Sequence, residues 1–139
     1  MELSINHLTF SVSNLQLAVN FYQNVFNAKL LVLGDKLAYF DLNGIWLALN
    51  LEQDIPRNEI YQSYTHISFS ITEQEYPIML KKLQDLRINI IESRVRHDNE
   101  GKSIYFRDPD GHLFELHTKT KEDRINFYKQ HRLELRFFE

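Results

Sequence analysis

The stretch INHLTFSV at residues 5–12 is repeated, with conservative changes, as YTHISFSI at residues 64–71. When the two stretches are superposed, His7 falls on His66 and the phenylalanines also coincide. A sequence that resembles itself in this way indicates two copies of one supersecondary unit that pack on each other. The two histidines then occupy equivalent places, so the duplication predicts that residues far apart in the chain can meet at one site.

A second pair of similar stretches follows the two openings. AYFD at 38–41 precedes Gly44, and IYFR at 104–107 precedes Gly111. In the first copy the apolar residues alternate along the opening strand and then, after an N-cap at Asn14, recur at helical spacing. This copy, about 4–51, is predicted to contain strand 5–12, helix 15–27 and strands 29–33, 36–42 and 45–50.

The second copy, about 64–118, follows a polar linker at about 52–63. Thr72 and Glu75 have the spacing of a capping box and predict the start of its helix. Its strands are predicted at 64–71, 88–95, 102–107 and 112–118, and a C-terminal helix over about 120–131 is expected to begin with a Thr120–Asp123 capping box. The fold class is therefore α+β: one domain of 139 residues with paired βαβββ units that form a cupped mixed sheet around a metal site. The tail at 131–139 receives no assignment.

Three side chains that can bind a metal lie on the polar faces of these strands: His7, His66 and Glu115. Two imidazoles and one carboxylate suit a divalent ion such as Mn, Fe, Zn or Ni, and three protein ligands leave positions open for a substrate. By the repeat, Ala48 is the counterpart of Glu115 and cannot bind a metal. Thr9 shares a face with His7, so its hydroxyl is predicted to lie near the ion. The remaining histidines lack the support of the repeat and are interpreted as surface or hydrogen-bonded residues: His97, His112, His117 and His131.

Other side chains are candidates for lining a pocket because of the strand faces they share: Trp46 with Asn50, and Ser103 with Tyr105. Three arginines are candidate anion binders, since a guanidinium fork matches the oxygens of a phosphate or phosphonate: Arg94, Arg107 and Arg124.

The composition of the chain excludes several classes of function. A formal net charge of −3 without a basic cluster argues against nucleic acid as a partner, and there is no apolar run long enough to span a membrane. No secretory signal is visible at the N-terminus, which favours the cytoplasm. The sequence has no cysteine, so a thiol nucleophile of its own and a disulfide framework are both excluded.

The motif DPDGHLFEL at 108–116, within the doubled βαβββ pattern, resembles the vicinal oxygen chelate (glyoxalase-like) superfamily. Further stretches resemble the fosfomycin-resistance metallothiol transferases, in particular the bacillithiol-using branch of Gram-positive bacteria: LAYF at 37–40, GIWLALN at 44–50, IPRNEI at 55–60, SYTH at 63–66 and SIYFRDPDGH at 103–112. The resemblance covers nearly the whole chain.

The resemblance implies a cytoplasmic homodimer that binds Mn²⁺ or Mg²⁺, with Zn²⁺ or Ni²⁺ as other possibilities, through His7, His66 and Glu115. It implies that a thiol from solution, bacillithiol or L-cysteine, opens the epoxide of fosfomycin with help from Glu115 and Thr9. The implied substrate-binding residues are Arg94, Tyr105 and Arg124 for the phosphonate, with Ser103, Trp46, Asn50, Tyr39 and Tyr64 around them. Many bacillithiol-type relatives have cysteine where this chain has Thr9, and glutathione-type relatives are similar to this chain there.

Two other functions remain open on the same fold. A drug-sequestering protein would bind without chemistry and without the His7, His66 and Glu115 set. Another metalloenzyme, such as an epoxide hydrolase or a dioxygenase, would need different residues on the inner faces; the related hydrolases carry a carboxylate base where this chain has Gly44, which cannot activate water.

Overall fold

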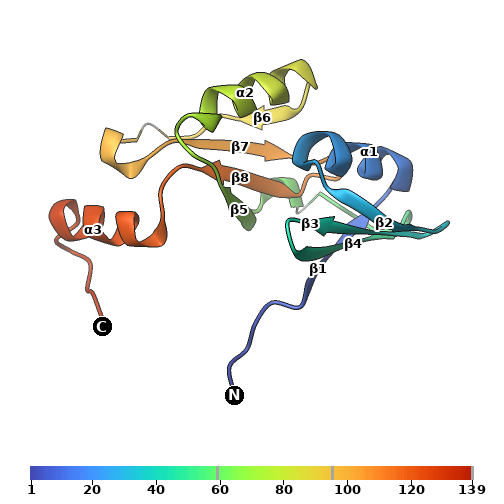
Figure 1. The fold of residues 1–139 in the computed structure, drawn as a ribbon, viewed down its shortest axis with the longest axis horizontal. Helices are drawn as coiled ribbons and strands as arrows, with labels where there is room; N and C mark the ends of the chain where they lie inside the picture. Colours follow the sequence, from blue (N-terminus) through green and yellow to red (C-terminus); the bar gives the residue numbers. More distant parts are fainter. Residues whose placement is uncertain (59, 95, 139) are drawn as a thin grey trace. The chain divides into compact units, whose positions relative to one another are not determined.

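The computed structural model describes residues 1–58, 60–94 and 96–138 (Figure 1). Glu59, Val95 and Glu139, which fall in the predicted linker, in the predicted strand at 88–95 and in the tail, lie outside the described residues. The elements are β1 (His7–Val12), α1 (Leu15–Phe26), β2 (Lys29–Leu33), β3 (Leu37–Leu42), β4 (Ile45–Leu51), η1 (Ile60–Gln62), β5 (His66–Ser70), α2 (Glu75–Asp85), β6 (Asn89–Ile91), η2 (Asp98–Glu100), β7 (Ser103–Arg107), β8 (Leu113–His117) and α3 (Lys121–His131). The predicted βαβββ order is therefore confirmed in both copies, with the additional helix at the end.

The chain forms two compact units. Unit 1 comprises Met1–Ser63 together with Asp108–His112, and unit 2 comprises the remainder. In unit 1 the four strands run in the order β1-β4-β3-β2, with β1 parallel to β4 and the other pairs antiparallel. Asn14 caps α1 as predicted, because its side chain accepts a hydrogen bond from Leu17 N. Unit 1 has a core of apolar side chains from α1, β3 and β4 that include Ala18, Val19, Tyr22, Val25, Phe40, Leu47 and Leu49.

Unit 2 repeats this arrangement with the strand order β5-β8-β7-β6, in which β5 is parallel to β8. Its buried apolar residues include Leu83, Ile104, Phe106, Leu113, Phe114, Leu116 and Phe127. The Thr120–Asp123 capping box is formed as predicted. Thr72 and Glu75 also bond each other's backbone N–H, but α2 begins only at Glu75, and its N-cap residue Gln74 makes no side-chain cap hydrogen bond.

The strand registers show that the repeat is structural. In unit 1, Ala48 lies between Thr9 of β1 and Tyr39 of β3. In unit 2, Glu115 lies between Ser68 of β5 and Tyr105 of β7. The predicted equivalence of Ala48 and Glu115 is therefore confirmed, and within each unit residues in register share a face of the sheet.

A buried polar network holds the turn after β7 inside unit 1. The Asp108 carboxylate accepts hydrogen bonds from Tyr22 Oη and His112 Nδ1, both at 2.7 Å, and from the backbone N–H groups of Asp110 and His112. Burial and the charge of Asp108 raise the pKa of Tyr22 well above its usual value. Four donors therefore converge on one carboxylate that water cannot reach, which makes Asp108 a structural anchor.

Arg57 ties the predicted linker to the same unit. Its Nη1 donates to Ser11 O at 2.9 Å, its Nη2 donates to Ser11 Oγ at 3.0 Å and to Glu52 O at 2.6 Å, and its Nε lies 3.4 Å from Asp110 Oδ1. The segment at 52–63 also contains the short helix η1, which was not predicted from the sequence.

One predicted strand is much too long. The strand expected at 88–95 is only Asn89–Ile91. In the polar sequence that follows, His97 and Glu100 form a capping box around η2, and Arg94 binds Glu100. These local hydrogen bonds engage backbone groups that a strand would need for pairing. A membrane-spanning helix is absent from the described residues.

Candidate functional site

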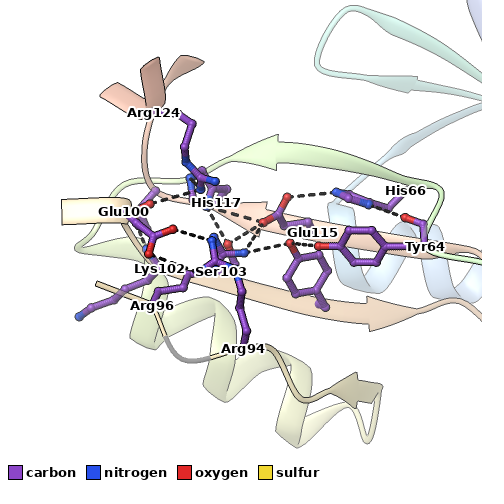
Figure 2. Close-up of polar contacts among 12 residues, drawn as sticks. Tyr64, His66, Arg94, Arg96, Glu100, Lys102, Ser103, Glu115, His117 and Arg124 are labelled. Atoms are coloured by element: carbon purple, nitrogen blue, oxygen red, sulfur yellow. Dashed lines mark hydrogen bonds and ion pairs between the residues drawn. The ribbon is translucent and has the colours of Figure 1, made fainter. Parts of the chain in front are cut away.

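A cavity of about 460 Å³ opens on the polar side of the unit 2 sheet. The lining combines cationic, aromatic and metal-binding side chains: Tyr64, His66, Arg94, Arg96, Tyr105, Glu115, His117, Lys119, Thr120, Lys121, Arg124 and Tyr128. Six of the predicted site residues are among them, brought together from β5, β7, β8, α3 and the segments before β5 and after β6. Figure 2 shows the polar contacts that join most of these side chains.

His66 and Glu115 face each other as metal ligands do. His66 Nδ1 lies 2.7 Å from the carbonyl oxygen of Tyr64, which can only accept, so Nδ1 carries the proton of the neutral ring. The lone pair is then on Nε2, which lies 3.3 Å from Glu115 Oε1 (Figure 2). When the ring is neutral, two lone pairs face each other, so this pair of side chains can hold a cation between them. A histidine held through Nδ1–H by a backbone carbonyl is typical of metal sites.

The other carboxylate oxygen of Glu115 is held by Ser103. Ser103 Oγ donates to Glu115 Oε2 at 2.6 Å and lies 2.7 Å from His117 Nδ1. Because the serine has only one proton, His117 Nδ1–H must be the donor in the second bond. His117 Nε2 then accepts from Arg124 Nη2, at 3.4 Å. The chain of donors from Arg124 to Glu115 leaves Oε1 as the oxygen that is available toward His66.

The environment keeps Glu115 ionised. Burial raises the pKa of its carboxyl, but hydrogen bonds from Ser103, Tyr105 and Ser68 outweigh this and hold it below its usual value. Burial likewise lowers the pKa of His117, so the neutral ring required by the hydrogen bonds is favoured. A carboxylate ligand must be deprotonated, and this arrangement meets that condition.

The remaining predicted residues lie in unit 1 on a single face of its sheet. His7 Nδ1 is 2.7 Å from Asn6 Oδ1, which leaves Nε2 with the lone pair, as in His66. The ring of Trp46 lies 4.5 Å from that of His7 and 5.4 Å from that of Tyr39, centroid to centroid. Thr9 and Asn50 continue the same face through the register of β1 and β4.

His7 thus belongs to a different unit from His66 and Glu115. Within the part of the chain that the structure describes, no three His, Cys, Asp or Glu side chains gather into a group that could hold a metal. The three-ligand set stays a prediction, and the donor chemistry of each of its members fits a divalent ion.

Comparison with known proteins shows which family the chain belongs to. The family model of the Glyoxalase/Bleomycin resistance protein/Dioxygenase superfamily matches residues 4–116. A metallothiol transferase FosB of Lysinibacillus sphaericus is 57% identical over 135 residues, which cover 97% of this chain and 96% of the relative. The chain belongs to the metallothiol transferase family of this superfamily. The FosB of Bacillus licheniformis is 55% identical over 99% of this chain and 89% of the relative.

Solved structures agree with the fold of this metallothiol transferase. The fosfomycin resistance protein FosX of Listeria monocytogenes has a TM-score of 0.80 at 33% identity and covers 89% of this chain and 99% of its own. Another structure of that FosX contains Mn(II) and a sulfate ion, with a TM-score of 0.79, 32% identity and coverage of 92% of this chain and 99% of its own.

Among the predicted anion binders of the transferase, Arg94 and Arg124 line the cavity, whereas Arg107 is the last residue of β7. The fork of Arg94 is occupied by Glu100, with Nη1 3.2 Å from Oε1 and Nη2 2.5 Å from Oε2. Arg124 donates to Tyr128 Oη at 3.2 Å as well as to His117.

Six residues of the cavity lining were not among the predicted site residues: Arg96, His117, Lys119, Thr120, Lys121 and Tyr128. His117 was interpreted as unrelated to the metal, although its position two residues after Glu115 on one strand puts both side chains on the same face. Arg96 was not among the predicted site residues. It lies just beyond the strand predicted at 88–95, and no periodic pattern could show that its guanidinium donates to Tyr105 Oη, 3.0 Å away.

Acidification should reveal the Arg94–Glu100 contact. Hydrogen bonds from Arg94 and, against burial, from His97 N lower the pKa of Glu100 from 4.5 to about 2. A lowered carboxyl pKa stabilises the fold fully above pH 4.5, and that contribution disappears as the pH falls toward 2. We expect Glu100→Gln to be less stable than the wild type in urea at pH 7, and the difference to shrink steadily from pH 5 to pH 3. A constant difference across this range would contradict the assignment.

Proposed function

We propose that this transferase adds a low-molecular-weight thiol, bacillithiol or L-cysteine, to the epoxide of fosfomycin and so inactivates the antibiotic. The observation that carries the proposal is the His66 Nε2 to Glu115 Oε1 contact of 3.3 Å at the wall of a cation-rich cavity. It is supported by the membership of the chain in the metallothiol transferase family and by the likeness to FosX, a fosfomycin resistance protein.

In this proposal His66, Glu115 and His7 hold a divalent ion, Mn²⁺ or Mg²⁺, with Zn²⁺ or Ni²⁺ as further candidates. The donor set supports this, because each imidazole has its Nδ1–H engaged by an oxygen and its Nε2 lone pair left as a ligand. When bound, the ion supplies Lewis acidity toward the epoxide oxygen. The presence of Mn(II) in a FosX structure is consistent with this choice of metal.

The residues of the chain itself bind and orient the reactants. Arg94, Arg124 and Tyr105 hold the phosphonate, with Tyr64 beside them, and a 2.8 Å hydrogen bond joins the hydroxyls of Tyr64 and Tyr105. Ser103 fixes Glu115 as described above. Thr9 donates a hydrogen bond to the epoxide oxygen, while Trp46, Asn50 and Tyr39 shape the pocket. The face that these last residues share in unit 1 supports a common role.

The reaction then consists of one displacement. The thiol loses its proton and its sulfur attacks an epoxide carbon, so the S–C bond forms, the C–O bond breaks and the oxygen takes up the proton that the thiol released. Since the sequence contains no cysteine, the sulfur comes from a free thiol. We place the reaction in the cytoplasm, where such thiols are kept reduced. We also propose a homodimer, which the exposed Leu31, Val32 and Leu33 of edge strand β2 support.

Opening of the epoxide by water is less favoured than opening by a thiol, because Gly44 provides no base. Gly44, where the related hydrolases have a carboxylate base, occupies an exposed turn with φ +88° and donates its N–H to Asp41 Oδ1 at 2.8 Å. A glycine supplies no group that could take a proton from water. This observation favours thiol transfer over epoxide hydrolysis.

An assay of product formation tests the proposed thiol transfer. The protein is incubated with Mn²⁺ or Mg²⁺, fosfomycin and either bacillithiol or L-cysteine, and products are identified by mass spectrometry. We expect the ring-opened thiol adduct, and we expect EDTA to abolish its formation and added metal to restore it. A diol without adduct would identify a hydrolase. Drug binding that survives EDTA without turnover would identify a sequestering protein, and either result would refute the proposal.

A further inference from the structure

His117 is connected to the candidate metal ligand Glu115 through the hydroxyl of a single serine (Figure 2). The side chain of His117 is 14% exposed, and its Nδ1 lies 2.7 Å from Ser103 Oγ and 3.7 Å from Glu115 Oε2. Ser103 Oγ is in turn 2.6 Å from the same carboxylate oxygen. The imidazole nitrogen and the carboxylate therefore both face one hydroxyl, which has only one proton to donate.

Arg124 of helix α3 determines which of the two receives that proton. Its Nη2 donates to His117 Nε2 at 3.4 Å and to the carbonyl oxygen of Glu100 at 3.5 Å. A guanidinium can only donate, so Nε2 of the neutral ring is the acceptor and Nδ1 carries the proton. His117 Nδ1–H then donates to Ser103 Oγ, and the serine proton is left for Glu115 Oε2.

The opposite tautomer of His117 would disrupt this arrangement. A ring with its lone pair on Nδ1 would accept the Ser103 proton, and the serine oxygen would then face the carboxylate at 2.6 Å with lone pairs only. Two acceptors at that distance repel each other, so Glu115 would leave the orientation in which Oε1 faces His66. The tautomer of the histidine therefore controls the direction of the carboxylate through the serine.

The first copy of the repeat provides a comparison within the same chain. Asn50 is the counterpart of His117, because it lies two residues after the alanine that is equivalent to Glu115. In the strand registers His117 pairs with Ser103, whereas Asn50 pairs with Leu37. The histidine and serine are thus present in the copy that carries the carboxylate and are both replaced in the copy that lacks it. This difference is expected if the pair serves to orient the carboxylate.

We propose that His117 is a positioning residue for the metal ligand Glu115. It acts through Ser103, whose proton it commits to Glu115 Oε2, and so holds Oε1 toward His66. The role of Glu115 as a ligand rests on the proposed function, whereas the tautomer of His117 does not. Residues that orient a metal ligand through hydrogen bonds typically change metal affinity about 10- to 100-fold when they are replaced.

The first test needs neither metal nor turnover. The tautomer of His117 in the metal-free protein is determined at pH 8 from the ¹⁵N chemical shifts of the imidazole nitrogens, with the His117→Asn spectrum as the assignment. We expect a proton on Nδ1 and a bare Nε2. A proton on Nε2 would overturn the proposal, whatever the result of the thiol-transfer assay.

The second test compares two substitutions of the same shape. Asparagine keeps an N–H group in the place of Nδ1 and leucine does not. Binding of Mn²⁺ to the full chain, without fosfomycin or thiol, is measured by calorimetry. We expect His117→Leu to weaken it about tenfold or more and His117→Asn to weaken it less than about threefold. His131→Leu, at an exposed histidine outside the cavity lining, should leave it unchanged. Equal affinities in His117→Leu and His117→Asn would overturn the proposal.

A double-mutant cycle separates positioning from a purely structural role. If His117 acts through Ser103, His117→Leu should cause no further loss of Mn²⁺ affinity in a Ser103→Ala background, because no serine proton remains to be directed. Additive losses would contradict the proposal. Coupled losses together with failure of the thiol-transfer assay would refute the proposed substrate and leave the positioning role standing, so the two proposals can fail separately.

Discussion

Replacing Glu115 with glutamine is expected to lower kcat/KM for thiol transfer about a thousandfold, a loss of about 4 kcal/mol of transition-state stabilisation. Ser103 can still donate to the remaining oxygen, so the side chain keeps its place. The new amide group then faces His66 Nε2 and donates a proton to the lone pair that was 3.3 Å from Oε1. The variant fills the proposed ligand position with a hydrogen bond, and the Lewis acidity worth several kcal/mol is lost with the ion.

Two measurements check this expectation. Steady-state kinetics gives the loss of activity, and calorimetry with Mn²⁺ gives the loss of metal affinity, which should occur together. Glu92→Gln changes an exposed carboxylate and should alter neither quantity by more than about twofold. A Glu115→Gln enzyme that retained both wild-type metal affinity and wild-type kcat/KM would refute the role of Glu115 as a ligand.

Replacing Asp108 with alanine is expected to have the largest effect on stability, about 3–5 kcal/mol. The substitution leaves Tyr22 Oη, His112 Nδ1 and two backbone N–H groups without their shared acceptor in a buried place. Urea unfolding at pH 7 measures the change as a shift of the midpoint. Tyr22→Phe removes only one of the four donors, so it should cost about 1 kcal/mol.

The control for this prediction is Asp85→Ala. Asp85 is exposed and pairs with Lys81 one helical turn away, an interaction worth at most about 0.5 kcal/mol. If Asp108→Ala were as mild as Asp85→Ala, the network would not be the anchor of the turn.

The fold could be predicted from the sequence because the repeat and the hydrophobic periods are local in the chain. Alternation marked β1 and β5, and cap residues marked the starts of α1 and α3. The prediction failed in the polar segment after β6. There the choice between strand and turn depended on the Arg94–Glu100 pair and on the capping of η2, which no period expresses.

The candidate site was predictable in part for the same reason. The duplication assigned equivalent places to His7 and His66 and made Ala48 the counterpart of Glu115. The registers of the two sheets confirm that Ala48 and Glu115 are equivalent. Spacing within one strand could also have suggested His117. The buried and unsatisfied guanidinium of Arg96 could not have been inferred, since burial is a property of the surroundings.

The sequence by itself therefore determined the family, the doubled βαβββ architecture and the residue types able to bind a metal, because each is written in residue identity and spacing. Only the tertiary structure decided which ring nitrogens carry lone pairs, which oxygen of Glu115 is held by Ser103 and which arginine lacks acceptors. The physical reason is that hydrogen bonding and desolvation depend on neighbours brought together by folding, and these set the charge and the binding properties of a side chain.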